Sequence, residues 1–569
     1  MPLSAPASRL LLTLILGASL LTACGAENSS ASLLTEARAL VAAGDYKAAM
    51  IQLKNALAED ENNAEARYEL GKLYLGQLEL ESAEKEFRRA REAGYASTTV
   101  NPMIARALLG QREFQRVLDE LPAPLDNGPD ATTLLALRAT AALALGHKED
   151  ARKTLMQAQQ AAPDNAEVHL ALAQLALADG DTDKAMQALE QALNIDPGHR
   201  DSLLLKGDLL RATGKLDQAA SAYREVLEID PRHVNARLAL AGIAIAEIRL
   251  DDARREVDAA LKVMPSNLQA RYTQALIDFS EKKTERARDR LATVLKSAPN
   301  YIPALLLGGS IEYTLGNLQT AEAHLNKVVK ATPNNVYALR LLAASQLRLG
   351  RPDDAAKTLA PVLRSASQDT GVLTIAGEIA LARKEFAQAS AYFEQAAKRS
   401  PDSAAIRTEL GLSRLAQGDS RAMSDLQAAA DMDGSSSRAD TFIILNQLKQ
   451  KQFDAALASI AALEKKQAAN PLTWNYRGAA YLGKQDAVRA RESFSQALKL
   501  DPAFFPAAAN LAQLDLQDKQ PVAARQRFEG LLKADPRHLN AMLALADLSL
   551  RNKDEKAYVS WLEKAAAAH

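Results

Sequence analysis

The segment PLTWNYRGAAYLGKQDAVRARESFSQALKLDPAF, at residues 471–504, decides the fold. Its first half carries Trp474, Gly478 and Tyr481 at intervals of four and three residues, so these side chains share one face of an α-helix. The same kind of spacing recurs in the second half, at Ala490, Phe494 and Ala497. The segment therefore predicts two short helices joined by a turn near Gly483.

A ladder of prolines indicates that this two-helix segment is repeated. Pro502 ends the second helix, because proline lacks an amide N–H and disfavours helix in the residue before it. Prolines in the same place recur every 34 residues, at Pro163, Pro197, Pro231, Pro265, Pro299 and Pro333. Alignment on this period predicts sixteen units, which start at residues 30, 64, 98, 132, 166, 200, 234, 268, 302, 336, 370, 404, 437, 471, 505 and 539.

The repeated pattern resembles the tetratricopeptide repeat (TPR), although Arg477 stands where that family usually has an apolar residue. The resemblance implies an all-α fold, an α-solenoid of about sixteen helix-turn-helix units that wind into a right-handed superhelix. The eighth position of each unit is small, with Ile444 as the exception. A large apolar residue follows sixteen positions later in most units, as Phe494 follows Gly478, so we expect large-against-small packing inside each unit.

Two stretches interrupt the period. The third unit is degraded, because the prolines and glycine of Leu121–Pro129 end its second helix early and form a loop or a kink. The period also shortens by one residue within 418–437, and the Gly/Ser-rich stretch Asp431–Ser437 is the predicted joint. The predicted organisation is a signal peptide at 1–23, a lipidated tether at 24–31, units 1–3 at 32–131, units 4–12 at 132–436 and units 13–16 at 437–569.

The N-terminal residues indicate export. Arg9 precedes an apolar run at residues 10–21, which is too short to span a bilayer and has the length of a signal-peptide core. The run ends in Leu-Thr-Ala before Cys24, which is the single cysteine of the chain, so an intrachain disulfide is excluded.

These residues resemble a bacterial lipobox, which implies cleavage before Cys24, lipidation of its sulfur and stable anchoring by two or three acyl chains. Gly25 is not aspartate, and the sorting rule of that family then favours the outer membrane, with the protein facing the periplasm. The alternative is an ordinary secretory signal with an incidental cysteine.

Composition and motifs weigh against several function classes. The chain has 69 basic and 70 acidic residues, so no basic excess favours nucleic acid as a partner. The three Asp-Pro-x-His turns, at His199, His233 and His538, are expected to start helices rather than to bind zinc. No motif predicts a cofactor or metal site or a catalytic centre, and the repeats leave no room for a catalytic domain, so we predict that the protein is not an enzyme.

The resemblance also implies where partners bind. In TPR arrays the second, fifth, ninth and twelfth positions of each first helix line a concave groove. In unit six these positions include Asp201, Asp208 and Arg211, which suit a basic partner or are simply solvated. In units eight to ten they form an apolar and aromatic stripe that suits an extended peptide or a partner helix, although the same residues could instead pack within the array. That predicted protein-binding groove consists of Tyr272, Leu276, Phe279, Leu306, Tyr313, Tyr337 and Arg340.

The combined features predict a scaffold that binds envelope proteins and is held at the outer membrane through Cys24. A lipobox before a long TPR array is similar to the TPR lipoproteins of exopolysaccharide systems, including those of the exosortase (PEP-CTERM) type. One alternative is a lipoprotein of pilus or secretion-system assembly. Another, from a different class, is an envelope polysaccharide-modifying enzyme with accessory TPRs, which would need an acid/base pair.

Overall fold

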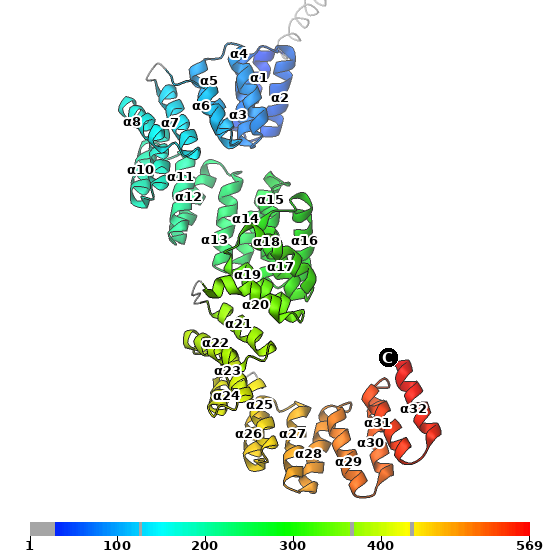
Figure 1. Ribbon diagram of the computed structural model, residues 1–569. Coiled ribbons are helices and arrows are strands. Elements are labelled where there is room, and N and C mark those ends of the chain that lie inside the picture. The colour runs from blue at the N-terminus through cyan, green and yellow to red at the C-terminus, as the bar shows by residue number, and fades with distance from the viewer. Residues whose placement is uncertain (1–28, 125–127, 365–368, 433–436, 569) are drawn as a thin grey trace, which may run out of the picture. The chain divides into compact units, whose positions relative to one another are not determined.

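The computed structural model describes residues 29–124, 128–364, 369–432 and 437–568, which form 32 α-helices and no strand (Figure 1). The signal peptide and Cys24 lie outside these residues. Contacts divide the chain into two compact units, Met1–Glu281 and Lys282–His569. The division falls in the turn inside the eighth predicted repeat.

The first unit contains fifteen of the described helices, in eight first-helix positions and seven second-helix positions of the repeats. They are α1 (Ser30–Ala42), α2 (Tyr46–Glu59), α3 (Ala64–Gly76), α4 (Leu80–Glu92), α5 (Ser97–Gly110), α6 (Phe114–Glu120), α7 (Pro129–Ala144), α8 (Lys148–Ala161), α9 (Ala166–Ala178), α10 (Thr182–Ile195), α11 (Arg200–Ala212), α12 (Leu216–Ile229), α13 (Val234–Ala246), α14 (Leu250–Val263) and α15 (Leu268–Ser280).

The second unit contains the remaining described helices, which complete the sixteen pairs. They are α16 (Thr284–Ser297), α17 (Ile302–Leu315), α18 (Leu318–Ala331), α19 (Val336–Arg348), α20 (Pro352–Arg364), α21 (Thr370–Ala382), α22 (Phe386–Arg399), α23 (Ala404–Gln417), α24 (Ala422–Met432), α25 (Arg438–Lys449), α26 (Phe453–Lys466), α27 (Pro471–Gly483), α28 (Ala487–Leu500), α29 (Phe505–Gln517), α30 (Pro521–Ala534), α31 (Leu539–Arg551) and α32 (Glu555–Ala568).

The predicted register is confirmed, because thirteen of the sixteen first helices begin at the predicted residue. The largest difference is at α7, which begins at Pro129 rather than at 132, so the predicted boundary between units 3 and 4 falls inside this helix. Proline is well tolerated in a first helical turn, where its missing N–H would have no partner. In the third unit, the second helix α6 has only seven residues.

The structure places the shortening of the period earlier than predicted. In the twelfth repeat the fully buried Leu426 packs against Gly411, one residue sooner than the period requires, and Ala422 takes the place expected for residue 423. The lost residue therefore belongs to the turn between α23 and α24, and not to Asp431–Ser437. A turn can absorb such a deletion because its backbone conformation is not fixed by helical hydrogen bonds.

Each repeat is held together by the predicted large-against-small contact. Where the eighth position is glycine, its partner is usually an aromatic ring, as in the pairs Gly71–Phe87, Gly207–Tyr223, Gly377–Phe393 and Gly478–Phe494. Where it is alanine, the residue sixteen positions on is usually aliphatic and fully buried, as at Leu53, Leu155 and Leu189. A smaller side chain on the first helix is thus matched by a larger side chain on the second helix, which keeps the packing density of a protein interior.

The turn inside every repeat contains one residue with a left-handed backbone. Seven repeats use glycine there, such as Gly44 at φ 78°, and nine use another residue, such as Leu78 at φ 58° and Ile248 at φ 61°. Left-handed geometry is unfavourable for residues with a Cβ, especially branched apolar ones. Leu78 and Ile248 are therefore the strained turn residues, and both side chains are exposed.

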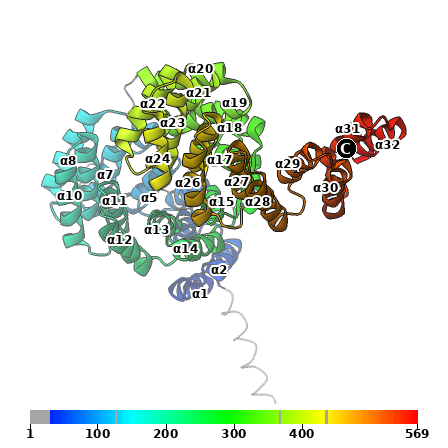
Figure 2. The same ribbon diagram turned by 90° about the horizontal axis from the view of Figure 1, so that it is seen from below.

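Within the first unit, the stacked pairs wind round so that its early and late repeats approach one another. Figure 2 shows α2 beside α14, and residues of the α3–α4 turn line one cavity with residues of the α12–α13 and α14–α15 turns. The guanidinium carbon of Arg232, in the α12–α13 turn, lies 5.0 Å from the ring centroid of Tyr46, at the start of α2. This approach encloses the cavities that form the candidate site.

Candidate protein-binding surfaces

Three residues of the predicted groove lie on α15 in the first unit. Tyr272, Leu276 and Phe279 are each partly buried. Their neighbours Ala275 and Ile277 on the same helix are fully buried. The three side chains therefore lie at the margin of the core, where they contribute to packing and still offer surface to a partner.

The other four residues of the predicted groove lie on α17 and α19 in the second unit. Leu306 and Tyr313 pack against a buried cluster that includes Leu305 and Leu342, which agrees with the packing alternative left open by the sequence. Tyr337 is 44% exposed, and its hydroxyl lies 3.0 Å from the Ser310 hydroxyl.

Arg340 is the cation of this surface. Its guanidinium carbon lies 5.3 Å from the ring centroid of Tyr337, and its Nη1 donates to Asp369 over 3.3 Å. Arg348 is placed similarly over Tyr313, at 4.9 Å. Both tyrosine rings thus already contact a cation, a weak attraction at exposed sites that orients each ring.

A cavity of about 450 Å³, called here the groove cavity, lies on the inner face of the first unit. Most of its lining comes from the groove positions that the TPR resemblance implies, including the predicted Asp201 and Asp208. Leucines supply most of its apolar lining. The lining residues are Leu75, Leu78, Leu80, Arg106, Leu109, Gly110, Leu137, Thr140, Glu167, Leu170, Gln174, Arg200, Asp201, Leu204, Leu205 and Asp208.

Polar contacts between repeats hold the walls of the groove cavity in place. Arg106 of the third repeat pairs with Glu167 of the fifth and lies 3.4 Å from a carboxylate oxygen of Asp201 in the sixth. Thr140 donates to Gln174 over 2.7 Å. These contacts orient side chains of four successive repeats, so the cavity is organised before any partner binds.

Asp208 is held by its own repeat. The hydroxyl of the buried Tyr223 donates to the Asp208 carboxylate over 2.7 Å. Burial, and then this hydrogen bond to the carboxylate, raise the pKa of Tyr223 far above its usual value. The hydroxyl thus stays protonated and keeps Asp208 oriented. Arg211 lies 3.8 Å from this carboxylate, whereas Asp201, the third polar residue predicted on this surface, lies near Arg106 and Arg200 instead.

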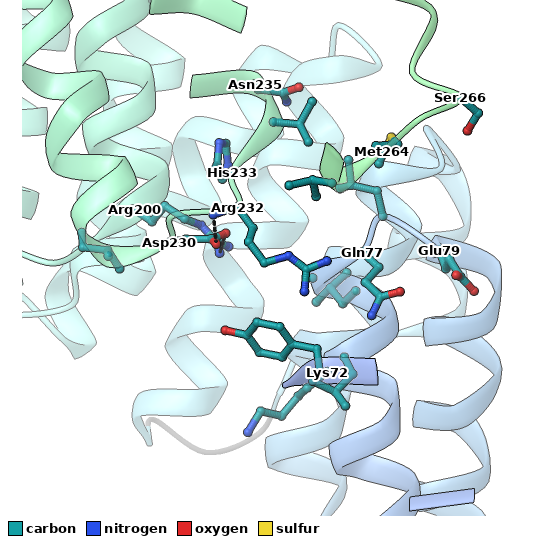
Figure 3. A pocket seen from close by; sticks show the side chains of 18 of the residues that line it. Lys72, Gln77, Glu79, Arg200, Asp230, Arg232, His233, Asn235, Met264 and Ser266 are labelled. Atoms are coloured by element: carbon teal, nitrogen blue, oxygen red, sulfur yellow. Dashed lines mark hydrogen bonds and ion pairs between the residues drawn. The ribbon is translucent and has the colours of Figure 1, made fainter. Parts of the chain in front are cut away.

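A second cavity of about 600 Å³, called here the bridging cavity, lies between the α3–α4 turn and the α12–α13 and α14–α15 turns (Figure 3). It shares Leu75, Leu78 and Arg200 with the groove cavity. The remaining lining residues are Tyr46, Lys72, Leu73, Gly76, Gln77, Glu79, Ile229, Asp230, Arg232, His233, Val234, Asn235, Val263, Met264, Pro265 and Ser266. None of these residues was predicted from the sequence as part of a site.

The histidines of the Asp-Pro-x-His turns start helices, as predicted. The ring Nδ1 atoms of His233 and His538 accept hydrogen bonds from the amides of Ala236 and Ala541 in the first turns of α13 and α31. Burial, and then the nearby Arg200, lower the pKa of His233. Its ring is therefore neutral near pH 7, which lets Nδ1 accept the capping bond.

His199 occupies the same place before α11, where its Nδ1 lies 2.8 Å from the Ser202 hydroxyl. Among the described residues, no three His, Cys, Asp or Glu side chains are grouped so that they could hold a metal ion. Within the same ranges, none of the helices combines the length and apolar character needed to cross a membrane.

Comparison with known proteins identifies the repeats. Two family models, each described as a tetratricopeptide repeat, match residues 40–107, 176–223, 210–277, 312–377 and 481–545, and residues 376–436 and 444–503. Neither model describes a catalytic family. A search of curated proteins returned no match.

Several solved structures are similar in part. Cut9, in its complex with Hcn1 from the APC/C, is 16% identical over 89% of this chain and 93% of its own, with a TM-score of 0.34. PilF of Pseudomonas aeruginosa is 19% identical over 35% of this chain and 90% of its own, with a TM-score of 0.32. PilW, described as a type IV pilus biogenesis factor, is 18% identical over 37% of this chain and 97% of its own, with a TM-score of 0.34.

The family models cover more than half of the chain, and helix pairs follow one another from α1 to α32 in the described residues. Arrays of this kind ordinarily serve as scaffolds for contacts between proteins. The chain belongs to the tetratricopeptide repeat family.

Proposed function

We propose that the protein is a scaffold of the bacterial cell envelope, whose first unit holds a segment of a partner protein in the groove cavity. The observation that carries this proposal is the cavity itself. Its lining combines a leucine floor with polar groups that are already fixed by contacts between repeats. Such a surface suits a peptide with apolar side chains at intervals, because the ordering cost falls mainly on the ligand.

The proposed location follows from the residues before the array. Lipidation of Cys24 would hold the scaffold at the outer membrane. The predicted tether at 24–31 would link the lipid to the first repeat, but its last two residues belong to α1, which begins at Ser30. A tethered array raises the effective concentration of one bound partner near another. The stripe on α15 and the surface on α17 and α19 are proposed as further contact surfaces, each within its own unit.

The system that we propose for the scaffold is exopolysaccharide biosynthesis and export, or the protein sorting associated with it. This part rests on the architecture of a lipobox followed by a long array. Co-purification with a polysaccharide synthase or export component would support it. Co-purification with pilus or secretion components alone would favour the alternative.

Site-specific crosslinking in intact envelopes tests the binding surface. A photoreactive benzoylphenylalanine replaces Gln174, which lines the groove cavity, and in a control chain it replaces Gln157, which is exposed on α8. We expect a discrete adduct from position 174 that is absent from position 157, and mass spectrometry then identifies the partner. Identical adducts from both positions, or none from position 174, would contradict the groove assignment.

A further inference from the structure

We propose that the bridging cavity binds a peptide segment in which a carboxylate lies beside a large apolar side chain. This inference rests on the proposed protein-binding function, because the bridging cavity continues the groove cavity through Leu75, Leu78 and Arg200. A peptide in the groove can therefore extend into it. The volume of about 600 Å³ is within the range of about 300–1,000 Å³ of ligand sites.

Arg232 supplies the main reason for a carboxylate. Its side chain reaches from the α12–α13 turn across the cavity towards Gln77 (Figure 3). Its guanidinium carbon lies 5.0 Å from the ring centroid of Tyr46, and no carboxylate within the described ranges forms an ion pair with it. A guanidinium that contacts a ring and has no carboxylate partner keeps N–H donors available, and its planar fork matches a carboxylate in a bidentate arrangement.

The other charges of the cavity leave this position suited to an anion. Lys72 is 45% exposed; its ammonium pairs with Glu69 at 2.9 Å and lies 5.6 Å from the ring centroid of Tyr68, and both partners are outside the lining. Asp230 accepts the backbone N–H of Arg232 at 3.0 Å and lies 3.8 Å from Arg200, so it is already engaged. Arg232, Lys72 and Gln77 therefore supply donors to the lining near α3, where the carboxylate of Glu79 also lies. With Arg200 and Asp230, the lining has three cationic side chains against two carboxylates, a balance that favours an anion over a cation.

Leu78 supplies the reason for a neighbouring apolar group. It is 54% exposed, and Ile229 across the cavity is 48% exposed. Leu78 also holds the left-handed turn conformation that seven other repeats assign to glycine. Leu78 is unfavourable for the free protein both because its apolar side chain is exposed and because its backbone is left-handed. Contact with an apolar group of a ligand would bury this side chain.

Fluorescence anisotropy of the purified full chain with short labelled peptides tests this proposal. The first probe is the capped peptide Ser-Leu-Leu-Glu-Leu-Ser, the second has Gln in place of Glu, and the third is Ser-Leu-Leu-Leu with a free C-terminal carboxylate. We expect at least tenfold weaker binding of the Gln peptide than of a carboxylate peptide. Comparison of the first and third probes distinguishes a side-chain from a C-terminal carboxylate.

Variants locate the binding. Arg232→Gln combined with Lys72→Gln should abolish the preference for the carboxylate. Leu78→Gly should raise the Kd of every probe several-fold without lowering the thermal midpoint, a combination that a merely structural role for Leu78 would not give. The matched control, Lys184→Gln with Lys215→Gln, removes the same charge from exposed positions outside both cavities and should leave binding unchanged.

Three results would overturn the proposal: equal binding of the Glu and Gln peptides, a carboxylate preference that survives in the Arg232 and Lys72 variant, or competition by inorganic phosphate at the same concentration as the peptide. If crosslinking from position 174 captures a partner while the peptides fail, the scaffold function stands and the bridging cavity is not a peptide site. If both fail, the proposed function fails with it.

Discussion

Replacement of Gly478 by alanine tests the packing rule that holds each repeat together. A Cβ at this position would lie 2.4, 2.6 and 2.7 Å from three atoms of the Phe494 ring. Carbon atoms pack favourably at about 3.5–4.0 Å, so the ring would have to move by about 1 Å. The ring is fully buried against Ala490, Ala497 and Leu511, which leaves little room for that movement.

The magnitude follows from two opposing effects. Overpacking of this kind costs about 1–3 kcal/mol, and three contacts below 3 Å favour the upper half of that range. Alanine is favoured over glycine inside a helix by about 0.8–1.0 kcal/mol. We therefore expect Gly478→Ala to lower the free energy of unfolding of this region by about 1–2 kcal/mol.

Urea unfolding followed by tryptophan fluorescence measures this effect. Trp474 lies on the same helix as Gly478, and Trp561→Phe leaves it as the only tryptophan reporter. Gly530→Ala is the matched control, because glycine 530 is inside α30 in the same unit and a Cβ there has no heavy atom within 4 Å. The control should stabilise by about 0.5–1 kcal/mol, so the same substitution has opposite signs at the two positions.

A double variant completes the test. Gly478→Ala with Phe494→Leu recreates the alanine and leucine pair found at Ala173 and Leu189, which packs with no exposed surface. We expect a favourable coupling energy of at least about 1 kcal/mol between the two substitutions. If the two effects simply add, or if Gly478→Ala stabilises as the control does, the packing rule is wrong.

Four further perturbations test other parts of the protein. Asp515→Asn should lower the free energy of unfolding by about 1–3 kcal/mol at pH 7. Burial raises the pKa of Asp515, but hydrogen bonds from two arginines outweigh burial, so the net pKa is lowered. Because the pKa of Asp515 is lower in the folded state, its carboxylate stabilises the fold at pH values above the unfolded pKa of about 3.9. This stabilisation is lost as the pH falls through the folded pKa, so urea titrations should show that the difference in unfolding free energy between the two proteins vanishes in acid. Cys24→Ser should release the protein from membranes, and Gly25→Asp should retain it at the inner membrane, both read by fractionation. Tyr313→Ala with Tyr337→Ala should weaken capture of a partner in a pull-down while circular dichroism stays unchanged.

The fold could be predicted because each repeat contains its own local sequence signals. Small residues at the eighth position and proline after the second helix are local signals, and they recur often enough to correct one another. The prediction failed only where the repeats themselves are irregular, at the α23–α24 turn and before Pro129. The number of residues between repeat motifs shows that one residue is missing, but it does not show which of two adjacent turns lacks it.

The groove cavity could be predicted in part, and the bridging cavity could not. Groove positions lie at fixed places in each repeat, so Asp201 and Asp208 were assigned to the inner face by register alone. The bridging cavity depends instead on the approach of Tyr46 to Arg232, which belong to the first and sixth repeats. That approach is the sum of small rotations between neighbouring pairs, and no single pair reveals it.

This dependence has a consequence for how the first unit can respond to partners. A site built across several repeats is sensitive to a small change at every junction between them, because each rotation displaces one wall relative to the other. The links from Arg106 to Glu167 and Asp201 restrain the junctions between the third and sixth repeats. A partner bound in the groove cavity contacts these same repeats, so it would bias the spacing of the bridging cavity and thereby its affinity for a carboxylate. By reciprocity, a ligand between Tyr46 and Arg232 would favour the same curvature of the groove.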